Sequence, residues 1–150
     1  MDNIEIIVDT REQKKYVEDV CDERGIKHSR AKLNYGDYGI KINGILQPFT
    51  VERKKDIQEI VGNLSKGYER FCREFERSDG NMAVVVHGNE SDIAERKYLY
   101  GAAPRYIIAN LKRMRKNFPS IHWHFVDRNS PEYIVDLLLN NNDYPLVYHD

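Results

Sequence analysis

The chain has 150 residues and a formal net charge of −1; 41% of its residues are hydrophobic and 31% are charged. This length and composition suit one soluble globular domain with a core of its own, and they exclude a disordered chain. No apolar run approaches the length of a membrane span, and no signal-peptide pattern opens the chain, so we expect an intracellular protein with no membrane partner. A net charge near zero leaves a nucleic-acid partner open, because local charge patches decide that binding.

Hydrophobic periodicity predicts strands that alternate with helices. Residues 4–8 form a short apolar run rich in β-branched side chains, which is typical of a buried strand. Apolar residues then recur at helical spacing up to Gly25, a residue type that commonly follows a helix. Further on, the Asn43-Gly44 pair between two apolar runs is a strong signal for a two-residue hairpin turn. In chain order we expect a strand at 4–8, a helix at 14–24, a strand at 27–33, strands at 38–42 and 45–53, a helical segment at 56–77 broken near 65–67, a strand at 82–86, a helix at 91–98 opened by a serine cap, a helix at 104–117, a strand at 121–126, a helix at 130–140 and a tail at 144–150.

This alternation predicts an α/β fold in which a mixed central β-sheet is flanked by helices, within a single domain over residues 1–150. The sequence contains no internal repeat, linker or low-complexity tract. Its two cysteines, Cys21 and Cys72, both lie in predicted helices, and we expect reduced thiols.

The histidines of the last predicted strand invite a metal interpretation. Strand alternation explains His122-Trp123-His124 better, with Trp123 facing inward and both histidines outward. No third ligand lies at zinc-site spacing, so we expect no zinc site there.

Two carboxylates and a lysine lie on the predicted hairpin. Asp37 precedes its first strand, and Glu52 and Lys54 end its second. Alternate side chains of a strand share a face, so Glu52 and Lys54 should point the same way while Arg53 points the other way. The turn can bring these groups together in space. Carboxylates are hard oxygen ligands for Mg²⁺, and a lysine places a positive charge beside an attacking water, as metal-assisted hydrolysis of a phosphodiester requires.

Three motifs follow one another in a defined order. They are Val8-Asp9-Thr10-Arg11-Glu12, Gly36-Asp37-Tyr38 and Val51-Glu52-Arg53-Lys54. Together they resemble the nuclease domain of the XPF family of structure-specific endonucleases, over about residues 4 to 88 and weakly beyond. The order and spacing carry the resemblance, since each short motif alone would be weak. It implies a restriction-endonuclease-like fold of the PD-(D/E)xK superfamily and an Mg²⁺- or Mn²⁺-dependent endonuclease that cuts branched, flap or fork DNA in repair or recombination.

The resemblance also assigns roles to individual residues. Asp37 and Glu52 would be metal ligands, and Asp9 would be a further ligand or act through a water. Lys54 would orient the nucleophilic water or help to deprotonate it, and would stabilise the charge that grows on phosphorus.

Two charged residues of the motifs keep open roles. Arg53 either contacts the substrate or pairs with Asp9 or Glu12. Glu12 either supports the site or simply pairs with Arg11 or Lys14.

The sequence departs from the family pattern after the third motif. The family places an acid where this chain has Gln58, and the nearest acids are Asp56 and Glu59. Alignment of the following helix favours Glu59 as the supporting acid. No tandem helix-hairpin-helix module follows, so we expect a stand-alone nuclease domain.

The predicted helix around residues 66–77 is amphipathic. Its apolar face carries Tyr68, Phe71, Cys72 and Phe75, and its basic stripe consists of Lys66, Arg70, Arg73 and Arg77. Four positive charges in one stripe can follow a phosphate backbone. The alternative is a solvated face on which these residues pair with Glu69, Glu74 and Glu76.

Three functions remain open at this point. The first is the metal-dependent DNA endonuclease, and the presence of Asp37, Glu52 and Lys54 favours it. The second is a non-catalytic DNA-binding or scaffold subunit, since the family resemblance includes members that lost their acids. The third is a resolvase or RNase on the same fold. Each has a nucleic acid as partner, and a homodimer or a partner subunit is also open.

Overall fold

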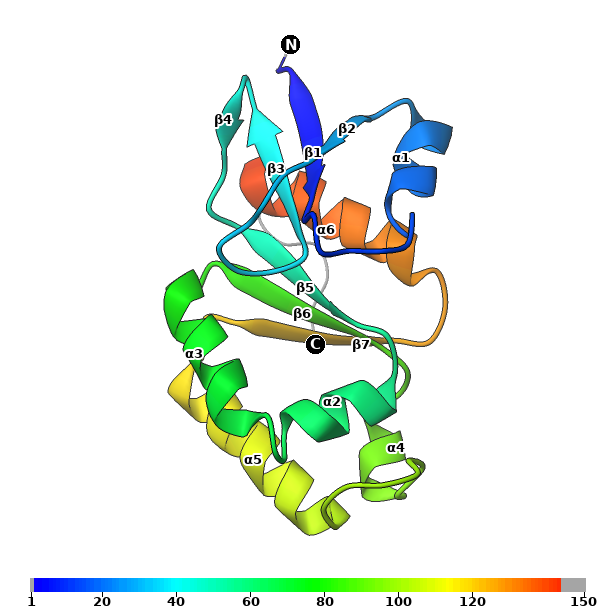
Figure 1. The fold of residues 1–150 in the computed structure, drawn as a ribbon, viewed down its shortest axis with the longest axis vertical. Helices are drawn as coiled ribbons and strands as arrows, with labels where there is room; N and C mark the ends of the chain where they lie inside the picture. The colour runs from blue at the N-terminus through cyan, green and yellow to red at the C-terminus, as the bar shows by residue number, and fades with distance from the viewer. Residues whose placement is uncertain (1, 144–150) are drawn as a thin grey trace.

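The computed structural model describes residues 2–143, so the predicted tail at 144–150 lies outside the described residues. Strands and helices alternate along the chain as the periodicity predicts (Figure 1). The elements are β1 (Ile4–Val8), α1 (Glu18–Arg24), β2 (Lys27–Arg30), β3 (Tyr38–Ile42), β4 (Ile45–Leu46), β5 (Thr50–Lys54), α2 (Ile57–Asn63), α3 (Tyr68–Ser78), β6 (Met82–His87), α4 (Ser91–Ala94), α5 (Pro104–Asn117), β7 (His122–Val126) and α6 (Ser130–Asp143).

Within the described residues the strands form one seven-stranded sheet. Its order is β2-β1-β3-β5-β6-β7, and the short β4 pairs with β3 outside this path. The sheet is mixed: β1 pairs with β3 in the antiparallel sense, whereas β5, β6 and β7 run parallel to one another. The predicted α/β fold with a mixed central sheet is confirmed.

Helices cover both faces of the sheet. Helices α1 and α6 lie against one face, and α2, α3, α4 and α5 lie against the other (Figure 1). The strand β6, which lies between β5 and β7, therefore buries both of its faces: Ala83 and Val85 belong to the core beneath α1 and α6, while Val84 and Val86 belong to the core beneath α2, α3 and α5. The sequence of a strand that is covered on both sides is typically a continuous apolar run, and Met82–His87 has that pattern.

The two-sided cover corrects the expectation for His124. Trp123 is buried and His122 is exposed, as predicted, but His124 is buried as well. Strand alternation does hold, since His124 faces away from Trp123. The face that His124 occupies is covered by α6, where the Tyr133 hydroxyl lies 2.7 Å from His124 Nδ1. The prediction that His124 points outward was wrong because α6 covers that face of β7 at His124, although it leaves His122 exposed.

Several element boundaries also differ from the sequence-based expectation. Helix α1 begins at Glu18 instead of residue 14, and β2 ends at Arg30 instead of residue 33. The expected strand at 45–53 is divided into β4 and β5, and Pro48, which has no N–H to donate to a strand ladder, lies between them. Helix α4 is only four residues long, and no side chain caps it, so the expected serine cap is absent. The hairpin turn and the break between α2 and α3 are confirmed.

Candidate active site

The candidate site is formed where β3 and β5 separate. The two strands pair at one position, where Tyr38 lies opposite Val51. Just beyond that pair, the Asp37 N–H donates to the Val51 carbonyl at 2.8 Å, and the Asp37 carboxylate accepts the Arg53 N–H at 2.7 Å. The carboxylate thus replaces the carbonyl that a continuing strand would offer. This contact turns Asp37 toward β5 and holds it beside Glu52.

Glu52 and Lys54 share one face of β5, as strand alternation predicts. Lys54 Nζ lies 2.8 Å from Glu52 Oε2, and Lys54 and Glu52 are only 6% and 8% exposed. The ammonium group also lies 4.7 Å from the centre of the Phe71 ring of α3. Both side chains are therefore held in place by burial, by each other and by one aromatic neighbour.

Burial makes the two carboxyl groups electrostatically unfavourable when both are ionised. Burial, followed by the charge of Glu52, raises the pKa of Asp37 far above its ordinary value. Burial also raises the pKa of Glu52, although Lys54 acts in the opposite direction. The two groups lie within hydrogen-bonding reach of each other, so a proton or a cation between them relieves their repulsion. Burial lowers the pKa of Lys54, but Glu52 outweighs it and keeps the lysine charged.

These groups lie in a cleft of about 400 Å³ whose other charged lining residues are three arginines and Glu74. Helix α3 contributes Arg70 and Arg77, and the loop after β1 contributes Arg11. All four residues of the predicted basic stripe are exposed, but among the described residues Lys66 and Arg73 do not line this cleft. The stripe therefore divides into two cleft arginines and two basic residues outside the cleft.

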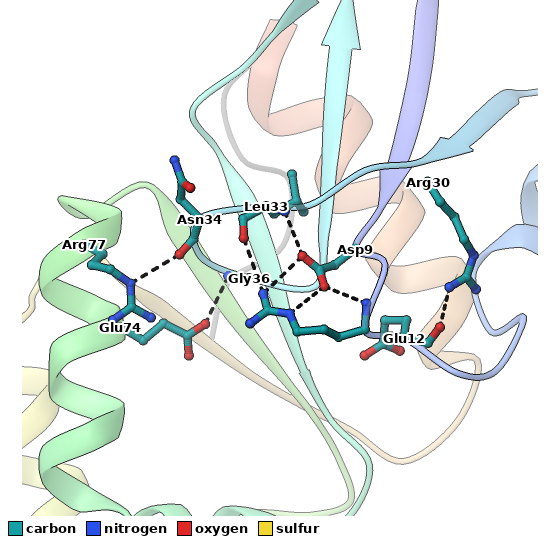
Figure 2. Close-up of polar contacts among 9 residues, drawn as sticks. Asp9, Glu12, Arg30, Leu33, Asn34, Gly36, Glu74 and Arg77 are labelled. Atoms are coloured by element: carbon teal, nitrogen blue, oxygen red, sulfur yellow. Dashed lines mark hydrogen bonds and ion pairs between the residues drawn. The ribbon is translucent and has the colours of Figure 1, made fainter.

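Asp9 lies next to this cluster but has partners of a different kind. Its carboxylate accepts the Leu33 N–H at 2.7 Å, the Arg11 N–H at 2.9 Å, and Nε and Nη2 of the Arg11 side chain at 2.7 and 3.1 Å (Figure 2). Burial raises the pKa of Asp9, but these hydrogen bonds outweigh it and the net shift is downward. Within residues 2–143, no group of three or more histidine, cysteine or acidic side chains is placed to hold a metal. Asp37 and Glu52 thus lie together, whereas the Asp9 carboxylate is hydrogen-bonded to Arg11 and Leu33.

The loop before β3 is fastened from both sides. On one side Asp9 and Arg11 bond the backbone of Leu33, and on the other side the loop is held by Glu74 and Arg77 of α3 (Figure 2). Glu74 accepts the Gly36 N–H at 3.1 Å, and Arg77 Nε donates to the Asn34 carbonyl at 3.2 Å. Gly36 has a φ of +76°, and a Cβ there would lie 2.3 Å from the Thr50 hydroxyl oxygen, so the turn before Asp37 requires glycine.

Arg11 and Glu74 are cleft residues that sequence reasoning missed. Arg11 stands inside the first motif, and that position was an available signal. Glu74 was considered only as a surface partner for the stripe, and nothing in its local sequence reveals the Gly36 contact.

Arg53 and Glu12 lie on the opposite face of the sheet. The Arg53 guanidinium lies 3.7 Å from the centre of the Tyr16 ring, and its Nη1 is 3.9 Å from Glu12 Oε2. The Tyr38 hydroxyl donates to the same Glu12 oxygen at 2.9 Å. The sequence left two pairings open for Arg53, with Asp9 or with Glu12. The structure shows the pairing with Glu12. Both residues support the sheet behind the cleft, and only the backbone of Arg53 contacts Asp37.

The acids after the third motif stabilise the start of α2. Asp56 accepts the Glu59 N–H at 2.8 Å, and Glu59 accepts the Lys55 N–H at 2.8 Å, which is a reciprocal capping arrangement. Among the described residues, neither acid lines the cleft. Gln58, at the position of the family's acid, is bonded to a distant loop: its amide donates to the Tyr100 carbonyl and accepts the Leu99 N–H, both at 2.8 Å.

Comparison with known proteins places this arrangement in a family. A family model, the ERCC4 domain, matches residues 8–141. The chain belongs to the ERCC4 domain family. A search of curated proteins found no significant match. The match extends well past the region that carries the sequence resemblance, so the C-terminal helices also belong to this ERCC4 domain.

Solved structures support the same fold. XPF from Aeropyrum pernix has 19% identity and a TM-score of 0.65, with 92% of this chain and 66% of that chain covered. XPF from Aeropyrum pernix in complex with DNA has 17% identity and a TM-score of 0.63, with 92% and 64% covered. The chain thus spans just under two thirds of the length of these proteins. The XPF resemblance and the restriction-endonuclease-like fold are confirmed. In residues 2–143, no helix has the length and apolar character needed to cross a membrane.

Proposed function

We propose that this ERCC4 domain is a divalent-metal-dependent DNA endonuclease in which Asp37, Glu52 and Lys54 act on the scissile phosphate. One observation carries the proposal. Two buried carboxyl groups with raised pKa values lie beside a charged lysine, in a cleft that is also lined by three arginines. An arrangement that is unfavourable without a ligand and complementary to a cation and a phosphate is typical of a functional site.

The residues present fit a magnesium or manganese ion. Asp37 and Glu52 would hold it, and two carboxylates suffice because Mg²⁺ keeps several waters and commonly binds substrate phosphate oxygens as well. The bound ion would supply Lewis-acid chemistry and lower the pKa of a water. The ion would also remove the repulsion that otherwise requires a proton between the two groups.

The remaining side chains bind and position the substrate. Lys54, held by Glu52 and Phe71, stabilises negative charge on the phosphoryl oxygens as water attacks. Arg11, Arg70 and Arg77 bind the flanking phosphates.

The groups behind the cleft are positioning residues. Asp9 fixes Arg11 and the loop that carries Asp37, and Glu12 with Arg53 supports β5 from behind. Glu59 acts through the start of α2. Asp9 is therefore omitted from the proposed metal ligands.

The substrate proposed is branched, flap or fork DNA in repair or recombination, as the ERCC4 family suggests. A scaffold role is less consistent with this chain because Asp37, Glu52 and Lys54 are all present and lie together. Removal of any one of them would be expected in a protein that only binds.

The test is a cleavage panel. Labelled flap, fork, splayed and linear DNAs, with RNA counterparts, are incubated with Mg²⁺, Mn²⁺ or EDTA. We expect wild type to cut branched DNA only when a metal is present, and Glu52→Gln to be inactive. Glu95→Gln, which changes an exposed carboxylate outside the cleft, is the matched control. Cleavage in EDTA, or by Glu52→Gln at the wild-type rate, would contradict the proposal.

A further inference from the structure

A second hollow adjoins the catalytic cleft, between α2 and the loop that joins α4 to α5. This second groove has a volume of about 900 Å³, against about 400 Å³ for the cleft. Asn63 lines both hollows, and Lys66 of the groove is followed directly by Gly67 of the cleft. A DNA strand that left the cleft around the end of α2 would therefore pass into this groove.

One wall of the groove presents apolar side chains to solvent. Leu99 is 89% exposed and Tyr100 is 70% exposed. The loop that carries them is nevertheless firmly held, since the Gln58 amide bonds the backbone of both residues. The Tyr98 hydroxyl also donates to the Ala102 carbonyl at 2.6 Å. Large apolar groups held in water on a fixed loop are typical of a binding surface.

Gly101 closes this loop onto α2. Its φ is +129°, and a Cβ there would lie 2.8 Å from Val61 Cγ1. Only glycine allows the loop to pack this tightly. Gln58 stands where the XPF resemblance expects an acid, and here its amide serves the loop instead. The position of Leu99 and Tyr100 is therefore built into the fold.

The charges of the groove are balanced. Lys55 and Lys66 are offset by Asp56 and Glu59, whose carboxylates cap α2. A neutral groove is poorly suited to follow phosphates, whereas stacking of a base on an aromatic ring needs no net charge. At the junction with the cleft, the Asn63 amide oxygen is buried and accepts no hydrogen bond from the described residues.

We propose that this groove binds an unpaired nucleotide of the DNA being cut, with its base stacked against Tyr100 and Leu99. The inference rests on the proposed endonuclease function and assigns this groove to the unpaired segment of the proposed substrate. The cleft arginines bind phosphates of either form, and the groove binds only the unpaired segment. Because every base has a stacking face, the groove selects DNA structure and not sequence.

The experiment measures binding in EDTA, where no cleavage occurs. Two DNAs share one duplex; one is blunt, and the other has an unpaired flap with 2-aminopurine at the junction. Tyr100→Ala should weaken flap binding about 5- to 150-fold, leave blunt binding unchanged, and abolish the 2-aminopurine fluorescence change seen with wild type. Tyr100→Phe should restore both readouts. Tyr106→Ala removes an exposed tyrosine of α5 that lies outside the groove, and it is the matched control.

Equal weakening on both DNAs, or none on the flap, would overturn the inference. So would a change in oligomeric state by sedimentation without loss of flap binding, because Tyr100 would then be part of a protein interface. Cleavage with Mg²⁺ is measured separately. Absence of cleavage by wild type contradicts the endonuclease proposal, whereas the groove is judged by flap-specific binding in EDTA.

Discussion

Asp9 and Asp37 lie side by side, yet the pKa values of their carboxyl groups are shifted in opposite directions. The Asp9 N–H donates to the Asp37 carbonyl at 2.9 Å, so the two residues are joined through the backbone. The Asp9 carboxylate accepts hydrogen bonds from Arg11 and from Leu33, and its pKa is lowered. The Asp37 carboxylate is buried beside Glu52, and its pKa is raised. The Asp9 carboxylate holds the loop through its hydrogen bonds, whereas the Asp37 carboxylate lies against a second carboxylate, an environment that favours a proton or a cation.

The largest expected effect concerns the reacting groups. Glu52→Gln and Lys54→Ala should each lower the cleavage rate by at least about 10²-fold, because each removes a charge that acts on the scissile phosphate. DNA affinity should change little, since several arginines supply it. Single-turnover cleavage and anisotropy measure the two quantities. If Lys54→Ala cut at the wild-type rate, the role assigned to Lys54 would be wrong.

The next effect concerns Asp9, whose carboxylate accepts hydrogen bonds from Leu33 and Arg11. Asp9→Ala should lower the free energy of unfolding by about 2 kcal/mol, because the buried Leu33 N–H loses its acceptor. Arg11 is largely exposed and adds little. Since the folded-state pKa of Asp9 is lowered, its stabilisation is present above the unfolded-state pKa and is lost as pH falls through the folded-state pKa. Urea denaturation at neutral and acid pH measures this, and a variant as stable as wild type at neutral pH would contradict the assignment.

In EDTA, Asp37→Asn should raise the free energy of unfolding, whereas Asp9→Ala lowers it. The pKa of Asp37 is raised in the folded state, so the folded protein binds more protons than the unfolded chain from about pH 4 up to that raised pKa. The free energy of unfolding of wild type therefore falls as pH rises through this window. We expect Asp37→Asn to be about 1–2 kcal/mol more stable than wild type near neutral pH. Urea denaturation of wild type at pH 5 and pH 8 measures this pH dependence. Equal midpoints of wild type at the two pH values would contradict the claim that Asp37 and Glu52 repel each other.

The smallest effect separates the arginines of α3. Arg70→Ala with Arg77→Ala should weaken binding to every duplex and make its salt dependence shallower, by about one unit of slope for each phosphate that an arginine no longer neutralises. Arg73→Ala lies on the same helix but outside the cleft and should match wild type. Affinities at several salt concentrations decide between this division and a wholly solvated stripe, for which all three changes would be silent.

Sequence reasoning identified the elements that depend on local patterns. The hairpin turn, the shared face of Glu52 and Lys54 and the break between α2 and α3 follow from turn chemistry and periodicity. The burial of His124 did not, because it depends on α6 covering that face. The difference between Arg73 and Arg77 depends on how α3 is rotated against the sheet.

The contrast between the two aspartates could not be predicted from the sequence either. Motif position makes Asp37 a metal ligand and Asp9 either a further ligand or a group that acts through a water. The difference comes from the Leu33 N–H, 24 positions from Asp9, and from the separation of β3 and β5 next to Asp37. Both are tertiary features.

Calorimetric titration with Mn²⁺ tests the central claim most directly. Wild type, Asp37→Asn and Asp9→Asn are compared, with circular dichroism confirming that each is folded. The account predicts that Asp37→Asn loses Mn²⁺ binding, whereas Asp9→Asn retains it because Asp9 is not a ligand. Undiminished binding by Asp37→Asn, or loss of binding by a folded Asp9→Asn, would contradict the assignment of the metal to Asp37 and Glu52.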